Sequence, residues 1–205
     1  MGEEFFAHAL AVVGTVCYIV RAGPATFRIA RGHGIDPDAG LTLGLLFLTG
    51  VWWGAYSLEI HNWPSLISAA VGMVAPAFGL TVLARAHAVK RGIVFVLAAG
   101  LVVIFFEEEL SPRVMGLTAA VGAAGIAIPQ TVRLLRNRDE SAADASLGTW
   151  ALLAFNGVVW LFYGFLVGHP LIGAPGLVAI PSSLLIMHRI RRDRRAAEFG
   201  GGGST

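Results

Sequence analysis

Seven long apolar runs constrain the fold of this chain more than any other feature. A bilayer core of about 30 Å requires roughly 20 apolar residues in helical form, and about 17 to 25 are tolerated. In lipid every backbone polar group must be bonded internally, which favours helices, and the alternating pattern of a barrel is absent. The runs therefore predict seven spanning helices, over residues 5–29, 41–58, 64–83, 92–106, 114–135, 148–167 and 170–187.

The composition also indicates a membrane protein. The 205 residues are 56% hydrophobic and 14% charged, whereas about a quarter of the residues in a soluble domain are charged. The single cysteine, Cys17, excludes an intramolecular disulfide. Lys and Arg residues are divided among the loops instead of forming one patch, so we expect no nucleic-acid partner. The expected surroundings are a lipid bilayer.

The positive residues also predict the orientation. Every Lys and Arg except Arg113 flanks or lies in the first, third or fifth connection or the tail. Since such residues are retained on the cytoplasmic side, we expect the amino terminus outside and the carboxyl terminus in the cytoplasm. The acidic run 107–109 then lies outside, either as a solvated loop or as a vestibule for cationic solutes. A composition rich in Ala, Gly, Arg and Val favours a bacterial cell membrane as the location.

Two copies of one pattern divide the chain. Each copy has a proline near the cytoplasmic end of its first run and a Trp-x-x-Tyr sequence in its second run. The spacing from proline to tryptophan is 29 residues in the first copy and 31 in the second. These motif residues are Pro24, Trp53 and Tyr56 in the first copy and Pro129, Trp160 and Tyr163 in the second. Such a repeat indicates one structural unit written twice.

The fourth run joins the two copies. With one span inserted between them, both copies run in the same direction across the membrane. The predicted fold is an all-α transmembrane protein of seven helices, built as two parallel triple-helix bundles joined by a linker helix (3+1+3). The natural ligand site lies between the bundles near the midplane. The expected parts are residues 1–86, a linker region 87–111, residues 112–190, and a basic tail 191–205 that ends in a Gly-rich segment.

At these motifs the chain resembles the PQ-loop superfamily, and within it the SWEET sugar facilitators. Pro129-Gln130-Thr131 matches the Pro-Gln signature, whereas Pro24-Ala25-Thr26 has lost the glutamine. Residues 160–164 match Trp-x-x-Tyr-Gly, and residues 53–57 match it except for the final glycine. The resemblance covers nearly the whole chain and implies transport of a small solute.

The resemblance also implies roles for particular residues. Pro24 and Pro129, with Gln130, are expected to act at a hinge or gate, because proline interrupts the helical hydrogen-bond ladder. Tyr56 and Tyr163 belong to the same hinge and gate set. For the prolines, a simple packing role is the alternative.

The substrate-binding residues are expected on the second helix of each copy. Trp53 and Trp160 are expected to face each other across the cavity, offering flat apolar faces to a sugar ring. Thr49 and Asn156 lie four residues earlier, on the same helical faces. The alternative is that both tryptophans belong to the interfacial aromatic belt.

The substrate is less well defined than the fold. Sugar-carrying members usually place an asparagine in the third helix of each bundle, and none occurs in residues 64–83 or 170–187. An amino acid, nucleoside or vitamin-like solute is therefore an alternative substrate. A further alternative is a seven-span receptor that binds its ligand without moving it.

The charged residues favour a passive mechanism. No Asp, Glu, Lys or Arg lies in the middle of a predicted span, whereas ion-coupled carriers generally need such a group. His8, near the outer end of the first run, is the nearest candidate for coupling. We therefore expect facilitated diffusion, or uniport, of a small neutral solute.

We expect no enzyme activity, no catalytic residue, no metal and no cofactor. Lys90 is the only lysine and lies in a loop, which disfavours a retinal protein. The expected partners are a small-molecule solute and the lipid bilayer, and the sequence leaves the formation of a homo-oligomer open.

Overall fold

The computed structural model describes residues 2–30, 39–85, 100, 111–136 and 147–200. All secondary structure in these ranges is helical, which confirms the all-α prediction for them. The helices are α1 (Gly2–Ala30), α2 (Ala39–Glu59), α3 (Trp63–Arg85), α5 (Pro112–Arg136), α6 (Leu147–Leu166) and α7 (Gly176–Gly200), with a short 3₁₀ helix, η3 (Pro170–Gly173). Apart from Gly100, the predicted fourth span, 92–106, lies outside the described residues, and so does the linker region of the 3+1+3 arrangement.

Three segments in the described part of the chain are long and apolar enough to cross a membrane. They are Trp63–Arg85, Leu147–Leu166 and Pro170–Arg195, and Glu4–Val20 is a shorter apolar helix. Large apolar side chains are also exposed on the helix surfaces, with Phe5 at 77% and Phe165 at 76% exposure. Such surfaces are unfavourable in water and suit a lipid environment.

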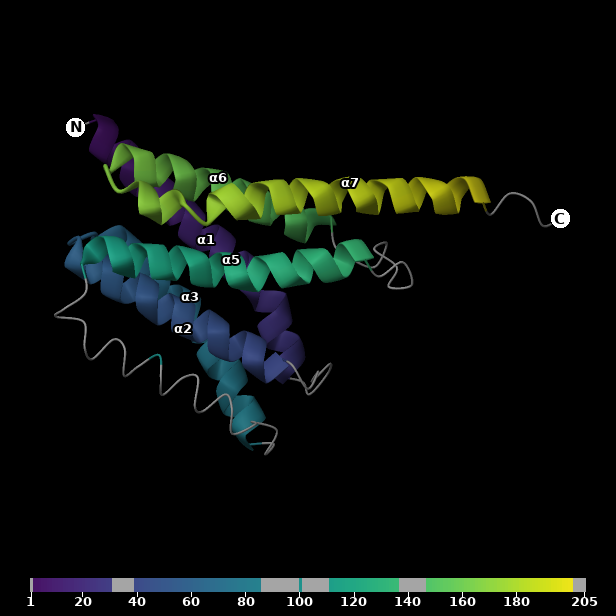
Figure 1. The fold of residues 1–205 in the computed structure, drawn as a ribbon, viewed down its shortest axis with the longest axis horizontal. Coiled ribbons are helices and arrows are strands. Elements are labelled where there is room, and N and C mark those ends of the chain that lie inside the picture. Colours follow the sequence, from purple (N-terminus) through teal and green to yellow (C-terminus); the bar gives the residue numbers. More distant parts are fainter. Residues whose placement is uncertain (1, 31–38, 86–99, 101–110, 137–146, 201–205) are drawn as a thin grey trace.

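The described helices pack as two sets of three. We call α1, α2 and α3 the first half, and α5, α6 and α7 the second half. Within the first half α3 packs against both α1 and α2, and within the second half α7 packs against both α5 and α6. Between the halves, α1 packs against α6 and α2 against α5 (Figure 1). Exchanging α1 with α5, α2 with α6 and α3 with α7 leaves this packing pattern unchanged.

The helix register repeats as well. Gly50 of α2 lies directly against the side chain of Met73 on α3. The residues 107 positions later, Gly157 of α6 and Ile180 of α7, lie against each other in the same way. Because glycine has no side chain, each pair brings its two helices close together. The two halves therefore repeat in packing as well as in motif.

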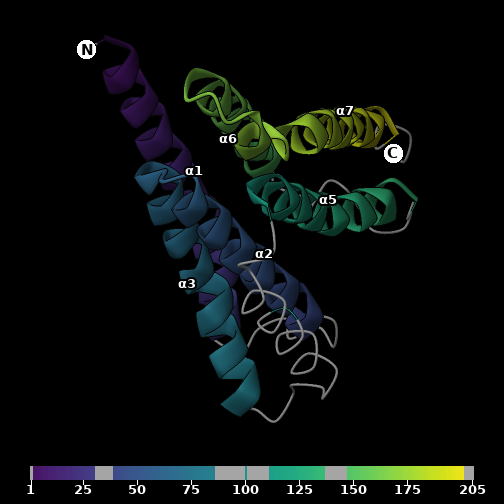
Figure 2. The ribbon, with the colours of Figure 1, turned by 60° about the vertical axis from the view of Figure 1, so that its left-hand side comes forward.

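One apolar core lies between the halves. It contains residues from the beginnings of α1 and α5, from the ends of α2 and α6, and from η3. Its buried members are Ala7, Ala11, Trp52, Tyr56, Met115, Ala119, Tyr163 and Ile172. Away from this core the two sets of helices diverge, as both ribbon views show (Figure 2). The halves are thus joined tightly at one end of the structure.

The last predicted span differs from the structure in its boundaries. Residues 170–187 were expected to form one helix, but the chain forms η3, breaks, and begins α7 at Gly176. Pro175 lacks a backbone N–H, and its carbonyl accepts bonds from Val178 and Ala179. α7 then continues to Gly200 through the arginine-rich segment, where Arg189 pairs with Asp193 at 3.3 Å. Hydropathy falls after Met187, but helix formation does not stop there.

Candidate functional site

The ends of α2 and α6 have the same local structure. His61 (φ 52°) and Gly168 (φ 72°) are both in the left-handed region. The His61 N–H donates to Leu58 O at 3.0 Å, and the Asn62 N–H donates to Ser57 O at 2.8 Å. The same two bonds recur 107 residues later and form a Schellman cap at each helix end. The repeated caps place the two Trp-x-x-Tyr motifs at equivalent positions.

Each Trp-x-x-Tyr motif forms a T-shaped aromatic pair. The ring centroids of Trp53 and Tyr56 are 5.8 Å apart at an interplanar angle of 70°. Those of Trp160 and Tyr163 are 5.3 Å apart at 80°. Residues three apart on a helix are neighbours, and this edge-to-face geometry is a favourable one for aromatic rings. Both tyrosines are buried in the core between the halves, and both tryptophans pack against it.

Small residues on α1 and α5 let the aromatic residues approach the opposite half. A Cβ added to Gly14 of α1 would lie 2.7 Å from Nε1 of Trp160 on α6. One added to Gly116 of α5 would lie 3.0 Å from Cε2 of Tyr56 on α2. The aromatic pair of each half thus lies against the first helix of the other half. The structure therefore places the Trp and Tyr residues of both motifs at one interface.

Thr49 and Asn156 lie one turn before the tryptophans, but their surroundings differ. Thr49 is half-buried, and its hydroxyl donates to Leu45 O at 2.8 Å. It faces α5, because a Cβ added to Gly122 would lie 3.1 Å from Thr49 Oγ1. Asn156 is only 7% exposed, and its Oδ1 has no hydrogen-bond partner. Leaving such a group unsatisfied costs about 1–3 kcal/mol.

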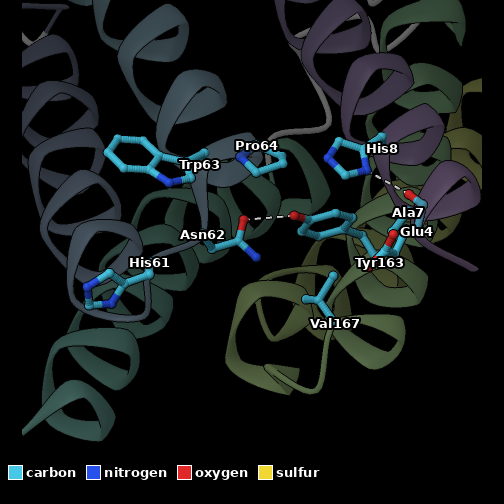
Figure 3. A pocket seen from close by; sticks show the side chains of 9 residues that line it. All are labelled: Glu4, Ala7, His8, His61, Asn62, Trp63, Pro64, Tyr163 and Val167. Atoms are coloured by element: carbon cyan, nitrogen blue, oxygen red, sulfur yellow. Dashed lines mark hydrogen bonds between the residues drawn. The ribbon is translucent and has the colours of Figure 1, made fainter. Parts of the chain in front are cut away.

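A hydrogen bond joins the two halves at the end where they share the apolar core, which is called the closed end below. The Tyr163 hydroxyl on α6 donates to Oδ1 of Asn62 at 2.7 Å (Figure 3). Asn62 lies in the connection between α2 and α3, and the same oxygen accepts a bond from the Ser65 N–H at 3.0 Å. This second bond is an N-cap of α3. Below, the Tyr163–Asn62 bond is called the latch.

The latch continues into the first half as a chain of bonds. The Ser65 hydroxyl donates to Ser57 Oγ at 2.7 Å, and the Ser57 hydroxyl donates to the Trp53 carbonyl at 2.7 Å. This series of hydrogen bonds therefore leads from the Tyr163 hydroxyl to the backbone carbonyl of Trp53. Sequence reasoning missed Asn62, because its partner is 101 residues away. The N-cap signal of asparagine before an apolar run was the only local indication of a special role.

A cavity of about 300 Å³ opens beside the latch. It lies between the start of α1, the connection from α2 to α3, and the end of α6 (Figure 3). Its lining combines acidic, imidazole, amide and aromatic groups. The lining residues are Glu4, Ala7, His8, His61, Asn62, Trp63, Pro64, Tyr163 and Val167. His8, predicted near the outer end, lines this cavity, and its Nδ1 lies 2.7 Å from Glu4 O.

The predicted hinge residues are only partly described. Pro24 lies within α1, and Pro129 and Gln130 lie within α5, and both helices are continuous through these positions. The side chains of these three residues lie outside the described part of the structure. In the described ranges no group of three or more His, Cys, Asp or Glu is placed to hold a metal ion.

No protein-family model matches the chain, and no curated protein matches it.

Proposed function

We propose that the chain is a seven-span membrane transporter that moves a small neutral solute by facilitated diffusion, with a mono- or disaccharide as the first candidate. The solute site lies between the two halves, near Trp53, Trp160, Thr49 and Asn156. Rocking of the halves opens it to each side of the membrane in turn. The proposal includes an outward amino terminus, a cytoplasmic carboxyl terminus, and a linker helix in the region 87–111.

One observation carries the proposal: the interface between two similarly packed halves is closed at one end and divergent at the other. The aromatic pairs and the latch lie at the closed end. The halves diverge toward the end that bears the proline motifs (Figures 1 and 2). Alternating access requires this type of asymmetry, with one gate closed while the other is open. The positive-inside pattern assigns the closed end to the outside.

Proteoliposome uptake tests the proposal. Labelled glucose, sucrose and a panel of amino acids are offered with and without a pH gradient, to the intact protein and to Trp160→Ala and Asn156→Ala. Phe165→Ala is the matched control, because Phe165 is an aromatic residue of the same helix that is 76% exposed and lies outside the core between the halves and outside the cavity. We expect sugar equilibration that does not depend on the gradient, is lost in the two site variants and is retained in the control.

The other outcomes separate the alternatives. Uptake of an amino acid or another solute without sugar uptake would support a transporter and would show that its substrate is not a sugar. Binding without uptake of any solute identifies a receptor. Uptake that requires the pH gradient contradicts the uniport mechanism.

A further inference from the structure

The cavity beside the latch has an acidic lining. Among the described residues that line it there is one carboxylate, that of Glu4, and no lysine or arginine. Its volume of about 300 Å³ is that of a small ligand site. None of the four residues proposed for the solute site belongs to this lining, so the cavity is a separate site. The charge of its lining favours a cationic occupant.

The hydrogen bond of His8 determines what its ring offers to the cavity. Nδ1 lies 2.7 Å from the carbonyl oxygen of Glu4. Since a carbonyl oxygen can only accept, Nδ1 carries the hydrogen, and in a neutral imidazole Nε2 is then an acceptor. Nε2 lies on the side of the ring toward Pro64, across the cavity from α1 (Figure 3). Glu4 and His8 are one helical turn apart, so α1 contributes a negative charge and a second acceptor to one wall.

Asn62 offers a donor from the other side of the cavity. The Ser65 N–H can only donate, so the Asn62 atom that it meets is the oxygen, and the other amide atom is the NH₂ group. The oxygen already accepts bonds from Ser65 and Tyr163. Among the described residues the NH₂ group has no hydrogen-bond partner. Because the two bonds to the oxygen hold the amide in place, this donor is held in a fixed position.

We propose that the cavity binds a primary ammonium group, carried either by a free amino alcohol or by the ethanolamine headgroup of a lipid. An –NH₃⁺ group has three donors and no acceptor, which suits the Glu4 carboxylate and Nε2 of His8. An oxygen two carbons away accepts a bond from the Asn62 amide. The Tyr163 ring and Val167 supply the apolar part of the lining. This site is independent of the proposed transport function.

Three small probes separate the contributions of charge and of N–H donors. Ethanolamine has both at pH 7, choline has the charge without an N–H, and ethylene glycol has neither. Their dissociation constants are measured by titration calorimetry in detergent at constant ionic strength. We expect choline to bind about 5-fold more weakly than ethanolamine, and ethylene glycol at least about 10-fold more weakly, because bonds to charged groups are the stronger ones.

Two variants assign the binding to the wall formed by α1. Glu4→Gln keeps the carbonyl that orients His8, and it should weaken ethanolamine binding about 5- to 10-fold. Glu59→Gln is the matched control, because Glu59 is an exposed acid at the end of α2 that does not line the cavity. His8→Leu should weaken ethanolamine binding and leave choline binding nearly unchanged, since only ethanolamine can donate to Nε2.

Nanodiscs identify the source of the ammonium group. The ethanolamine titration is repeated in nanodiscs of phosphatidylcholine with and without phosphatidylethanolamine. Free ethanolamine that binds only in the absence of phosphatidylethanolamine supports the site with a lipid headgroup as its occupant. Equal binding in both nanodiscs supports the site with a free amine as its occupant.

The contrary outcomes are equally specific. Equal weakening in Glu4→Gln and Glu59→Gln would reveal general charge attraction and overturn the proposed site. So would ethylene glycol binding as tight as that of ethanolamine, or the absence of saturable ethanolamine binding both in detergent and in phosphatidylcholine nanodiscs. Because the uptake assay uses different residues and solutes, a failure of amine binding leaves the proposed transport function standing, and a failure of sugar uptake leaves the ammonium site standing.

Discussion

The latch between Tyr163 and Asn62 should control how often the closed end of the interface between the halves opens. Tyr163→Phe removes the hydroxyl that donates to Asn62 across the halves, and it leaves the aromatic ring in place. Asn62 Oδ1 keeps its bond from the Ser65 N–H, so the change leaves no acceptor orphaned. The expected cost is therefore about 1 kcal/mol, a typical net value for a neutral hydrogen bond.

A cost of about 1 kcal/mol corresponds to a roughly fivefold change in the equilibrium between closed and open states. A cysteine at Ala119, which is 1% exposed in the core between the halves, reports that opening. It is introduced together with Cys17→Ala, because Cys17 is the single native thiol. Its reaction with a membrane-impermeant thiol reagent added outside should be about five times faster in Tyr163→Phe.

Two further variants test whether the hydrogen bond itself is responsible. Tyr56→Phe is the matched control, because the Tyr56 hydroxyl has no hydrogen bond among the described residues. Asn62→Asp keeps the acceptor and makes the bond charge-assisted, so the thiol should react more slowly than in the parent. Equal rates in Tyr163→Phe and Tyr56→Phe, or no slowing in Asn62→Asp, would refute a closing role for the latch.

The remaining predictions concern stability and can be measured by thermal unfolding in detergent. Gly14→Val should destabilise the fold by about 1–3 kcal/mol, because the added side chain overlaps Trp160. Gly125→Ala should not, since no atom lies within 4 Å of the added Cβ. His61→Gly should stabilise by roughly 0.5–1 kcal/mol, because it relieves a left-handed backbone, and Gly168→Ala should destabilise by about 1 kcal/mol. Destabilisation by His61→Gly together with stabilisation by Gly168→Ala would show that the caps do not control these helix ends.

Helix positions were predictable because the required signal is local. Span length and apolar content placed α2, α3 and α6 within a few residues of their bounds. The break before α7 was not predicted, because a hydropathy window cannot distinguish a 3₁₀ turn from an α-helix. Pro175 was visible in the sequence, but prolines also occur inside α3 and α7, at Pro76 and Pro181, without ending them. The fourth span and the seven-helix count remain predictions.

Parts of the candidate site were predictable from the repeat. Matching positions in two copies identified both aromatic pairs, and the structure places them at one interface. The latch required knowledge of which loop meets which helix, and a single sequence does not contain that information.

The length of α7 has a mechanical consequence. Its 25 residues form a rod of about 37 Å that begins directly after the break at Pro175. A pivot of about 10° at that break would displace the far end by roughly 6 Å, as a lever arm amplifies motion near its fulcrum. The carboxyl-terminal arginines would therefore sweep a larger path than any residue near the aromatic pairs. A spectroscopic label on that end would therefore report small changes in the angle of α7 as large displacements.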